Sequence, residues 1–301
     1  MAPSAVVPEG VEAIDKEALV SRNPHPDFGA VEASRPDYPV DLQWTPTKTR
    51  DPSWRYGDGA TDSKWQQHTL TTIDPYEPGR ASTLNYKLMI SSAVPRPIAL
   101  VSTVSAEGVQ NVAPFSYFQN VTADPPIYSV CFAGEVANDS LQNVMDTKEA
   151  CISIVSDWFV EAANATSINT PRHISEWQLS GLHPQPSDLV KPAYAAESAF
   201  SVELKYHSHQ TIIGKAGVRS ATLVLLEAVR FHVREDALGK DKATVDIAKL
   251  RPVWRGGGIT YGTCAHGFEL PRPEAFRTVR ETAEVKKLMG EGEESRNSIV
   301  D

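Results

Sequence analysis

Hydroxyl-bearing and aromatic side chains gather in residues 95–121, around a proline that interrupts a strand-like run. Ser102 and Thr103 lie in an apolar, β-branched segment that suits a buried strand, and Ser116 follows Pro114. Because proline has no N–H to donate, Pro114 must lie at a sheet edge, a bulge or a strand end. Backbone N–H groups beside hydroxyls and aromatic rings suit a flat aromatic ligand that carries a phosphate.

A second polar group precedes the helix that we expect over residues 140–147. We predict Asp139 as its N-cap, which places free N–H groups near residues 140–142. A helix N-terminus favours an anion through these N–H groups and through its dipole. Any single hydroxyl, such as that of Ser102, is more simply explained as part of an ordinary strand, so only the combined set favours a binding site.

The elements that must position these residues are mostly strands. Apolar or alternating runs predict strands over residues 98–104, 109–117, 127–132, 149–156, 200–213 and 221–234. Short helices are expected over residues 82–90, 140–147, 158–166 and 245–250, and a charged helix over 274–290. Because the strands do not alternate with helices as βαβ units, this order favours a mainly antiparallel barrel over a doubly wound fold.

Three regions are predicted along the chain. Residues 1–80 form a proline-rich N-terminal extension that is partly disordered, residues 81–270 form the barrel domain, and residues 271–301 form a charged helix and tail. The extension also contains three tryptophans, Trp44, Trp54 and Trp65. Two interpretations of the extension remain open: an arm packed on the barrel or on a partner subunit, and a loosely attached segment.

The composition restricts the classes of partner and compartment. A net charge of −9 over 301 residues argues against nonspecific binding to nucleic acid or to anionic membranes. No apolar run reaches the length of about 18 residues that a membrane span needs, and the first residues do not resemble a secretory signal. Three cysteines without a C-x-x-C pair fit a reducing compartment, so we expect a cytoplasmic protein.

Metal and nucleophile chemistry find little support in the sequence. His207 and His209 share a strand face but have no third ligand, and Cys264 with His266 lacks a partner pair at zinc spacing. We therefore predict no metal site. The sequence also has no G-x-G-x-x-G dinucleotide motif and no P-loop, and we name no general acid or base.

Several short motifs follow one another in a specific order between residues 84 and 270. They are RPIALVST at 96–103, NVAPFSYF at 111–118, DPP at 124–126, NDS at 138–140 with Asn143, NAT at 164–166, GL at 181–182, VKP at 190–192 and LRP at 250–252. In this order the chain resembles the flavin reductase-like family of FMN-binding split β-barrels. The resemblance implies an antiparallel, Greek-key-like split β-barrel with short inserted helices and an extended N-terminal arm. It also implies bound FMN and a homodimer with each flavin at or near the subunit interface.

The resemblance further implies which residues meet the flavin. Residues 111–118 would line the isoalloxazine ring, and residues 138–143 would lie near the phosphate and the ribityl chain. The expected cofactor-binding residues are Ser102, Thr103, Asn111, Ala113, Pro114, Phe115, Ser116, Phe118, Asn138, Asp139, Ser140, Asn143, Arg255 and Tyr261.

Two further features concern the positive charge near the phosphate and the loop that would meet the substrate. Many relatives carry a basic residue near the phosphate loop, but residues 135–138 here contain none, which leaves Arg96 or Lys148 as sources of positive charge. A long loop over the flavin face would bring Arg172, His173 and Trp177 to the substrate. Solvent exposure of His173 and simple anchoring of the loop by Trp177 are the alternatives.

The implied activity is that of a flavin-dependent oxidoreductase. Hydride would pass from NADH or NADPH to the flavin, and electrons would then pass to oxygen, to free flavin or to a partner monooxygenase. Two other classes remain open. One is a flavin-binding electron carrier without its own nicotinamide step, and the other is a barrel that has lost its cofactor and serves as an interaction module.

Overall fold

The computed structural model describes residues 28–297, and it describes side chains as far as residue 290. The chain divides into two compact units. Of the described residues, unit 1 contains 28–42 and 95–255, and unit 2 contains 43–94 and 256–297. The division therefore places residues 81–94 and 256–270, which the sequence suggested were part of the barrel domain, in unit 2.

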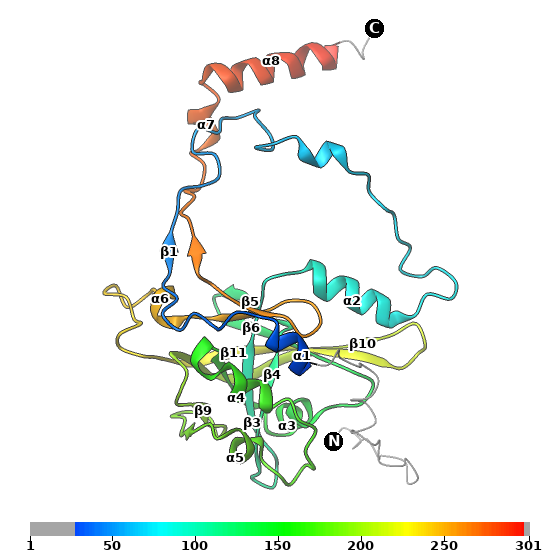
Figure 1. Ribbon diagram of the computed structural model, residues 1–301, viewed down its shortest axis with the longest axis vertical. Coiled ribbons are helices and arrows are strands. Elements are labelled where there is room, and N and C mark those ends of the chain that lie inside the picture. The colour runs from blue at the N-terminus through cyan, green and yellow to red at the C-terminus, as the bar shows by residue number, and fades with distance from the viewer. Residues whose placement is uncertain (1–27, 298–301) are drawn as a thin grey trace. The chain divides into compact units, whose positions relative to one another are not determined.

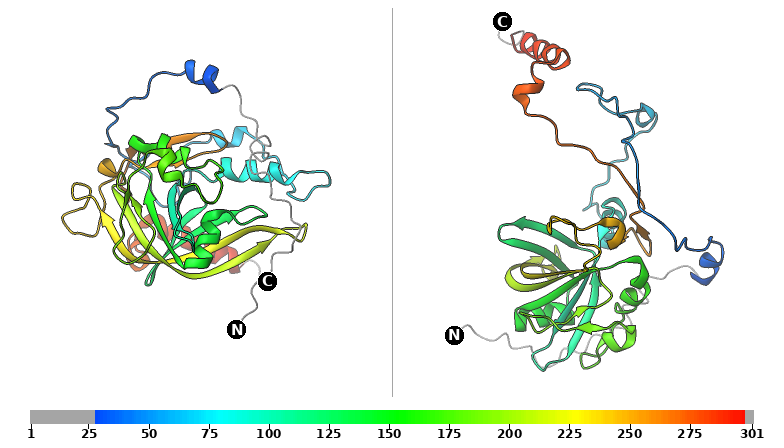
Figure 2. Two further views of the ribbon diagram at one scale, coloured as in Figure 1. Left: turned by 90° about the horizontal axis from the view of Figure 1, so that it is seen from below. Right: turned by 90° about the vertical axis from the view of Figure 1, so that its left-hand side faces the viewer.

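Unit 1 is built on a curved seven-stranded sheet (Figure 1, Figure 2). Its strands, in spatial order, are β4 (Gln110–Phe115), β3 (Ala99–Val104), β7 (Glu149–Ile154), β10 (Phe200–Ile213), β11 (Arg219–Val233), β6 (Pro126–Ala133) and β5 (Phe118–Ala123). Every neighbouring pair is antiparallel. The mainly β, antiparallel prediction is therefore confirmed, because the apolar runs pair directly with one another.

One face of this sheet carries the hydrophobic core. The registers place Val101 of β3 opposite Ile152 of β7, and Ile152 opposite Val202 of β10. All three side chains are buried, together with Leu204, Phe132 and others. Because strand side chains alternate between faces, the residues adjacent to these three in the chain must point to the other face.

The opposite face carries a second row, which consists of Ser102, Cys151 and Glu203 on the same three strands. A loop over residues 186–193, between the short strands β8 (Pro184–Gln185) and β9 (Tyr194–Ala195), covers this row. The Cys151 thiol lies 3.1 Å from the Pro192 carbonyl oxygen, and burial raises its pKa to about 12. Burial thus disfavours the thiolate form of Cys151, which is the reactive form of a cysteine.

Two details of the site region differ from the sequence prediction. The N-cap of helix α3 (Asp139–Thr147) is Asn138 and not Asp139, since the Asn138 side chain accepts a hydrogen bond of 2.9 Å from the Leu141 N–H. The segment expected as one strand over 109–117 ends as β4 at Phe115, and β5 begins at Phe118. The exposed, mostly polar side chains of β5 gave no alternating signal in the sequence.

Unit 1 also contains several short helices and strands. They are α1 (Phe28–Ala33), β2 (Arg96–Pro97), η3 (Asp157–Phe159), α4 (Val160–Ala165), α5 (Glu176–Ser180), α6 (Ile247–Leu250) and β12 (Val253–Arg255). Hydrogen bonds connect Tyr38 and Val40 to the Asp157–Arg251 ion pair of this unit. The Tyr38 hydroxyl donates to Asp157 over 2.8 Å, and Arg251 donates to Asp157 and to the Val40 carbonyl. Residues 1–27 of the predicted, partly disordered extension over residues 1–80 lie outside the described residues.

Unit 2 has little core of its own. It contains β1 (Thr45–Pro46) paired in parallel with β14 (His266–Gly267), and the elements η2 (Lys64–Gln67), α2 (Ser82–Ser92), β13 (Tyr261–Thr263), α7 (Phe276–Val279) and α8 (Ala283–Asn297). Among its described side chains, Ile90 and Val285 are the buried hydrophobic ones. Within residues 28–297, every helix is too short or too polar to cross a lipid bilayer.

Candidate functional site

A buried polar cluster joins β3, β4 and α3 on the core face of the sheet. The Asn111 side-chain amide donates to Thr103 Oγ1 over 3.3 Å and to Ser140 Oγ over 2.9 Å. The Asn143 amide donates to the same Thr103 oxygen over 3.0 Å. Because Thr103 and Asn111 are direct cross-strand partners, their side chains share a face, and the first turns of α3 bring Ser140 and Asn143 to them. We call these four residues the amide cluster.

Arg172 closes the amide cluster from the loop between α4 and α5. Its Nη2 donates to Asn143 Oδ1 over 2.9 Å. Its guanidinium also lies 3.4 Å from an Asp139 oxygen and 3.9 Å from an Asp146 oxygen. The sequence suggested that Arg172 belonged to a substrate loop, but its partners all lie on α3. Two carboxylates of α3 thus lie beside the Arg172 guanidinium.

A second group lies at the other end of β3 and β4. Arg96 Nε is 3.5 Å from Ser116 Oγ, and Arg96 pairs directly with Arg255 between β2 and β12. Ser116 follows Asn111 by five residues, which is about 17 Å of extended chain. We call Arg96, Ser116 and Arg255 the arginine cluster. The predicted site residues therefore form two groups at opposite ends of the same strands.

The edge of the sheet between these groups is β4. Glu176 is buried, and its carboxylate accepts from the Val112 N–H over 3.3 Å and from the Thr170 hydroxyl. That bond shows that the Val112 N–H points away from β3. By the two-residue repeat of a strand, Pro114 faces the same free side, where its missing N–H costs no ladder bond. The sequence predicted a sheet edge, a bulge or a strand end for Pro114, and the structure has it on the edge strand β4.

Several other predicted residues take structural roles. Ser102 points to the opposite face from Thr103, and its hydroxyl donates to the Ala193 carbonyl. The Phe115 ring packs edge-on against Phe132, with centroids 4.8 Å apart. The Phe118 ring, which is buried, stacks on Tyr128 with centroids 5.8 Å apart. Ala113 lies half-buried on β4.

The three residues predicted in the long loop, Arg172, His173 and Trp177, lie in three different environments. Trp177 is buried, and its Nε1 has no hydrogen-bond partner among the described residues. His173 is exposed, and Arg172 turns to α3. Sequence reasoning missed Glu176, because its partners Thr170 and Val112 are related to it only through the folded loop.

The remaining candidates lie elsewhere. Lys148 is the C-cap of α3, so it lies at the opposite end of the helix from Ser140, and its Nζ is 4.2 Å from the centre of the Tyr206 ring. Tyr261 is the first residue of β13 in unit 2. Of the two suggested sources of positive charge, Arg96 is therefore the one that contacts a predicted site residue.

Comparison with known proteins identifies the family. Residues 91–249 match the family described as "Flavin reductase like domain". An uncharacterised protein of Halalkalibacterium halodurans is 35% identical over 192 residues, which cover 63% of this chain and 91% of that protein.

Two solved structures extend the likeness to the fold. Nitrilotriacetate monooxygenase component B from Bacillus cereus has a TM-score of 0.64 and 31% identity, and the match covers 67% of this chain and 100% of that one. A flavin reductase with a split barrel domain from Shewanella frigidimarina has a TM-score of 0.57 and 21% identity, with 69% and 100% covered, and shows the fold. The chain belongs to the flavin reductase-like family of split-barrel flavoproteins, which gives it a flavin-related redox function.

Proposed function

We propose that this protein binds FMN and reduces it with NADH or NADPH, and that it delivers electrons to oxygen, to free flavin or to a partner monooxygenase. The observation that carries the proposal is the family match over residues 91–249, which contains β3, β4 and α3. It therefore includes the whole amide cluster, and it includes Arg96 and Ser116 of the arginine cluster. The partner monooxygenase is suggested by the Bacillus cereus structure, which is component B of such an enzyme.

We place the FMN phosphate at the arginine cluster. Arg96 and Arg255 are directly opposed cross-strand residues, so their side chains share one face of the β2–β12 pair and could both meet one anion. The Ser116 hydroxyl adds a donor beside Arg96. At the other end of the sheet, Arg172 lies beside the carboxylates of Asp139 and Asp146. Their negative charges would repel a phosphate bound there. The donor chemistry of the arginine cluster therefore fits a phosphate better than that of the α3 terminus.

The edge of β4 would hold the isoalloxazine ring. Bound FMN would supply the hydride-accepting ring system, and the residues of this chain would bind and orient it. The outward Pro114 carbonyl would accept from the imide N–H of the ring, while the missing proline N–H leaves no donor to desolvate. Glu176 and the buried Trp177 hold the adjoining loop against β4 and exclude water from that side.

The phosphate assignment is tested with matched arginine variants and two ligands. Arg96→Gln should weaken FMN binding by about 10- to 150-fold, the value of a hydrogen bond to a charged group, and should leave riboflavin affinity unchanged because riboflavin has no phosphate. Ser116→Ala should act in the same direction and cost about 1–3 kcal/mol of FMN binding. Flavin fluorescence titration measures both affinities.

Arg172→Gln is the matched control, because it removes an arginine at the other end of the same strands. It should lower FMN and riboflavin affinity equally or leave both unchanged. The phosphate assignment is wrong if Arg172→Gln erases the difference between the two ligands while Arg96→Gln does not.

The nicotinamide step is tested on the flavin-loaded protein without oxygen. Addition of NADH or NADPH should bleach the yellow absorbance within seconds. A protein that stays yellow would support the electron-carrier alternative, and a colourless protein that takes up no added FMN would support the interaction module. The dimer is tested by light scattering, and the cytoplasmic location stays a prediction.

A further inference from the structure

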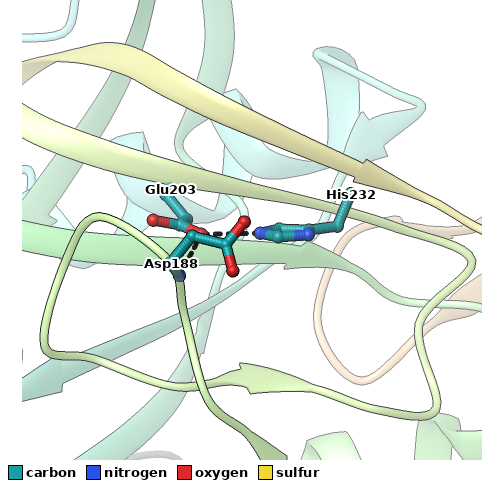
Figure 3. A group of neighbouring side chains, drawn as sticks. All are labelled: Asp188, Glu203 and His232. Atoms are coloured by element: carbon teal, nitrogen blue, oxygen red, sulfur yellow. Dashed lines mark hydrogen bonds and ion pairs between the residues drawn. The ribbon is translucent and has the colours of Figure 1, made fainter.

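Three ligand-type side chains meet on the loop-covered face of the sheet. Asp188 comes from the loop between β8 and β9, Glu203 from β10 and His232 from β11, and the three turn toward one another (Figure 3). Their ligand atoms all lie within 4.8 Å of one another. Among the described residues they are the one such group of three. None of them belongs to the proposed flavin site.

Glu203 is held rigidly as a carboxylate. Its side chain is fully buried, and its two oxygens accept the Asp188 N–H over 2.8 Å and the Leu189 N–H over 2.7 Å. Burial alone would raise the pKa of Glu203, but hydrogen bonds from the Asp188 amide, the His232 ring and the Leu189 amide outweigh it and hold the pKa below its usual value. Each oxygen has a second lone-pair direction besides its amide bond.

His232 is equally well oriented. Glu203 lies opposite Arg230 on β11, and His232 lies two residues further along, so its ring falls on the same face. The Tyr194 ring stacks on the imidazole with centroids 4.3 Å apart. His232 Nε2 is 2.6 Å from Glu203 Oε1 and must carry the proton of that bond. A shift of this proton to Nδ1 would give Nε2 a free lone pair without any change in charge.

Asp188 provides an adaptable third group. Its side chain is 53% exposed, and its oxygen Oδ2 pairs with Arg230 over 3.1 Å, whose side chain is 46% exposed. An ion pair with such exposure contributes about 0–1 kcal/mol, so it is a weak restraint on the Asp188 carboxylate. Asp188 can therefore turn toward Glu203 and His232 at small cost.

We propose that Asp188, Glu203 and His232 form a binding site for a divalent transition metal ion with the ligand preference of Zn²⁺, with water completing the coordination. Zn²⁺ holds nitrogen and oxygen ligands at about 2.0–2.2 Å in a tetrahedron, which separates neighbouring ligand atoms by about 3.3 Å. The Nε2–Oε1 separation of 2.6 Å must then open slightly, and the outermost separations of up to 4.8 Å must close. The exposed Asp188 side chain supplies most of that movement.

The role of this ion would be structural. It would join the 186–193 loop to β10 and β11, because Asp188 is on the loop and the other two ligands are on the strands. The same loop meets Ser102 through the Ala193 carbonyl and Cys151 through the Pro192 carbonyl. The ion would thus hold the 186–193 loop against the sheet. The opposite face of the sheet carries the amide cluster.

The test is a zinc titration of the full-length protein after chelator treatment and removal of the chelator. Calorimetry with ZnCl₂ should show one ion per chain, and Zn²⁺ should raise the melting temperature. Mutation of a residue that only orients a metal ligand usually lowers the metal affinity by about 10–100-fold. His232→Ala and Asp188→Asn remove direct ligands, so each should weaken Zn²⁺ binding by about 10-fold or more. Asp188→Asn is expected to fold, because this side chain is half exposed.

His209→Ala is the matched control, because His209 is an exposed histidine of β10 whose ring contacts Tyr206. It should leave the affinity for Zn²⁺ unchanged. The proposal is overturned if the folded wild-type protein binds no stoichiometric Zn²⁺, or if Asp188→Asn and His232→Ala both bind it as tightly as wild type. Flavin is absent from this titration, so its outcome does not depend on the proposed function.

Discussion

The two faces of the seven-stranded sheet each bury a polar group, and they stabilise it in different ways. On the core face, the amide cluster consists of neutral side chains that satisfy one another. On the opposite face, Glu203 is a buried charge that is satisfied by two backbone amides of a loop and by His232. The amide cluster is joined mainly by hydrogen bonds between its own side chains, with one donor from the Arg172 loop, whereas Glu203 depends on the backbone of the loop that covers it.

This difference predicts different consequences of mutation. A neutral hydrogen bond in a protein contributes about 0.5–1.5 kcal/mol, whereas a hydrogen bond to a charged group such as the Glu203 carboxylate contributes about 1.5–3 kcal/mol. The loop-covered face should therefore be the more sensitive to loss of one side chain. It should also respond to pH, because it contains the charged groups.

The largest expected effect is that of Glu203→Ala. The change leaves the Asp188 and Leu189 amides and His232 without their acceptor, and each buried donor left unsatisfied costs about 1–3 kcal/mol in the free energy of unfolding. Urea denaturation in the presence of a chelator measures it. Glu235→Ala, which removes an exposed glutamate just beyond β11, should change the free energy of unfolding little. Equal effects of the two changes would contradict the distinction between the faces.

Thr103→Val should have the next largest effect. Valine keeps the shape of the buried side chain but gives no acceptor to the amides of Asn111 and Asn143, which should cost about 1–3 kcal/mol. Thr222→Val is the matched control, since the Thr222 hydroxyl serves only Arg219, which also donates to backbone carbonyls. If Thr222→Val destabilises as strongly as Thr103→Val in urea denaturation, the amide cluster has no special role.

The smallest expected effect is on the acid dependence of stability. The pKa of Glu203 is lowered on folding from its usual 4.5, so its ionised form contributes stability above that pH, and this contribution is lost as the pH falls through the folded-state pKa. Glu203→Gln should flatten the decline of the unfolding free energy below pH 4.5 relative to wild type. Chemical denaturation at a series of pH values measures the slope, and parallel curves would show that Glu203 does not titrate in this way.

The hydrophobic periodicity of the sequence predicted six of the seven strands of the large sheet, all except the exposed strand β5. Residues 98–104 and 200–213 differ from the observed β3 and β10 by at most one residue at an end, because buried strands need continuous or alternating apolar side chains. The edge position of Pro114 is one of the three placements that its missing N–H allowed. The family resemblance added the split barrel and the flavin, which composition and periodicity alone do not specify.

The partners of individual polar side chains could not be predicted in this way. Ser102 and Thr103 are adjacent in the sequence but point to opposite faces, so one meets a loop carbonyl and the other meets two amides. The N-cap was assigned one residue too late, because Asn138 and Asp139 are both good capping residues and only the backbone geometry distinguishes them.

The sequence by itself determined the order of the strands along the chain, the short helices and the family. These depend on local periodicity and on motifs of a few residues. Only the tertiary structure decided that the predicted site residues separate into an amide cluster and an arginine cluster, that Arg172 turns to α3, and that Glu203 meets His232. The physical reason is that such contacts join residues many positions apart, and they exist only after strand pairing and loop closure have brought those residues together.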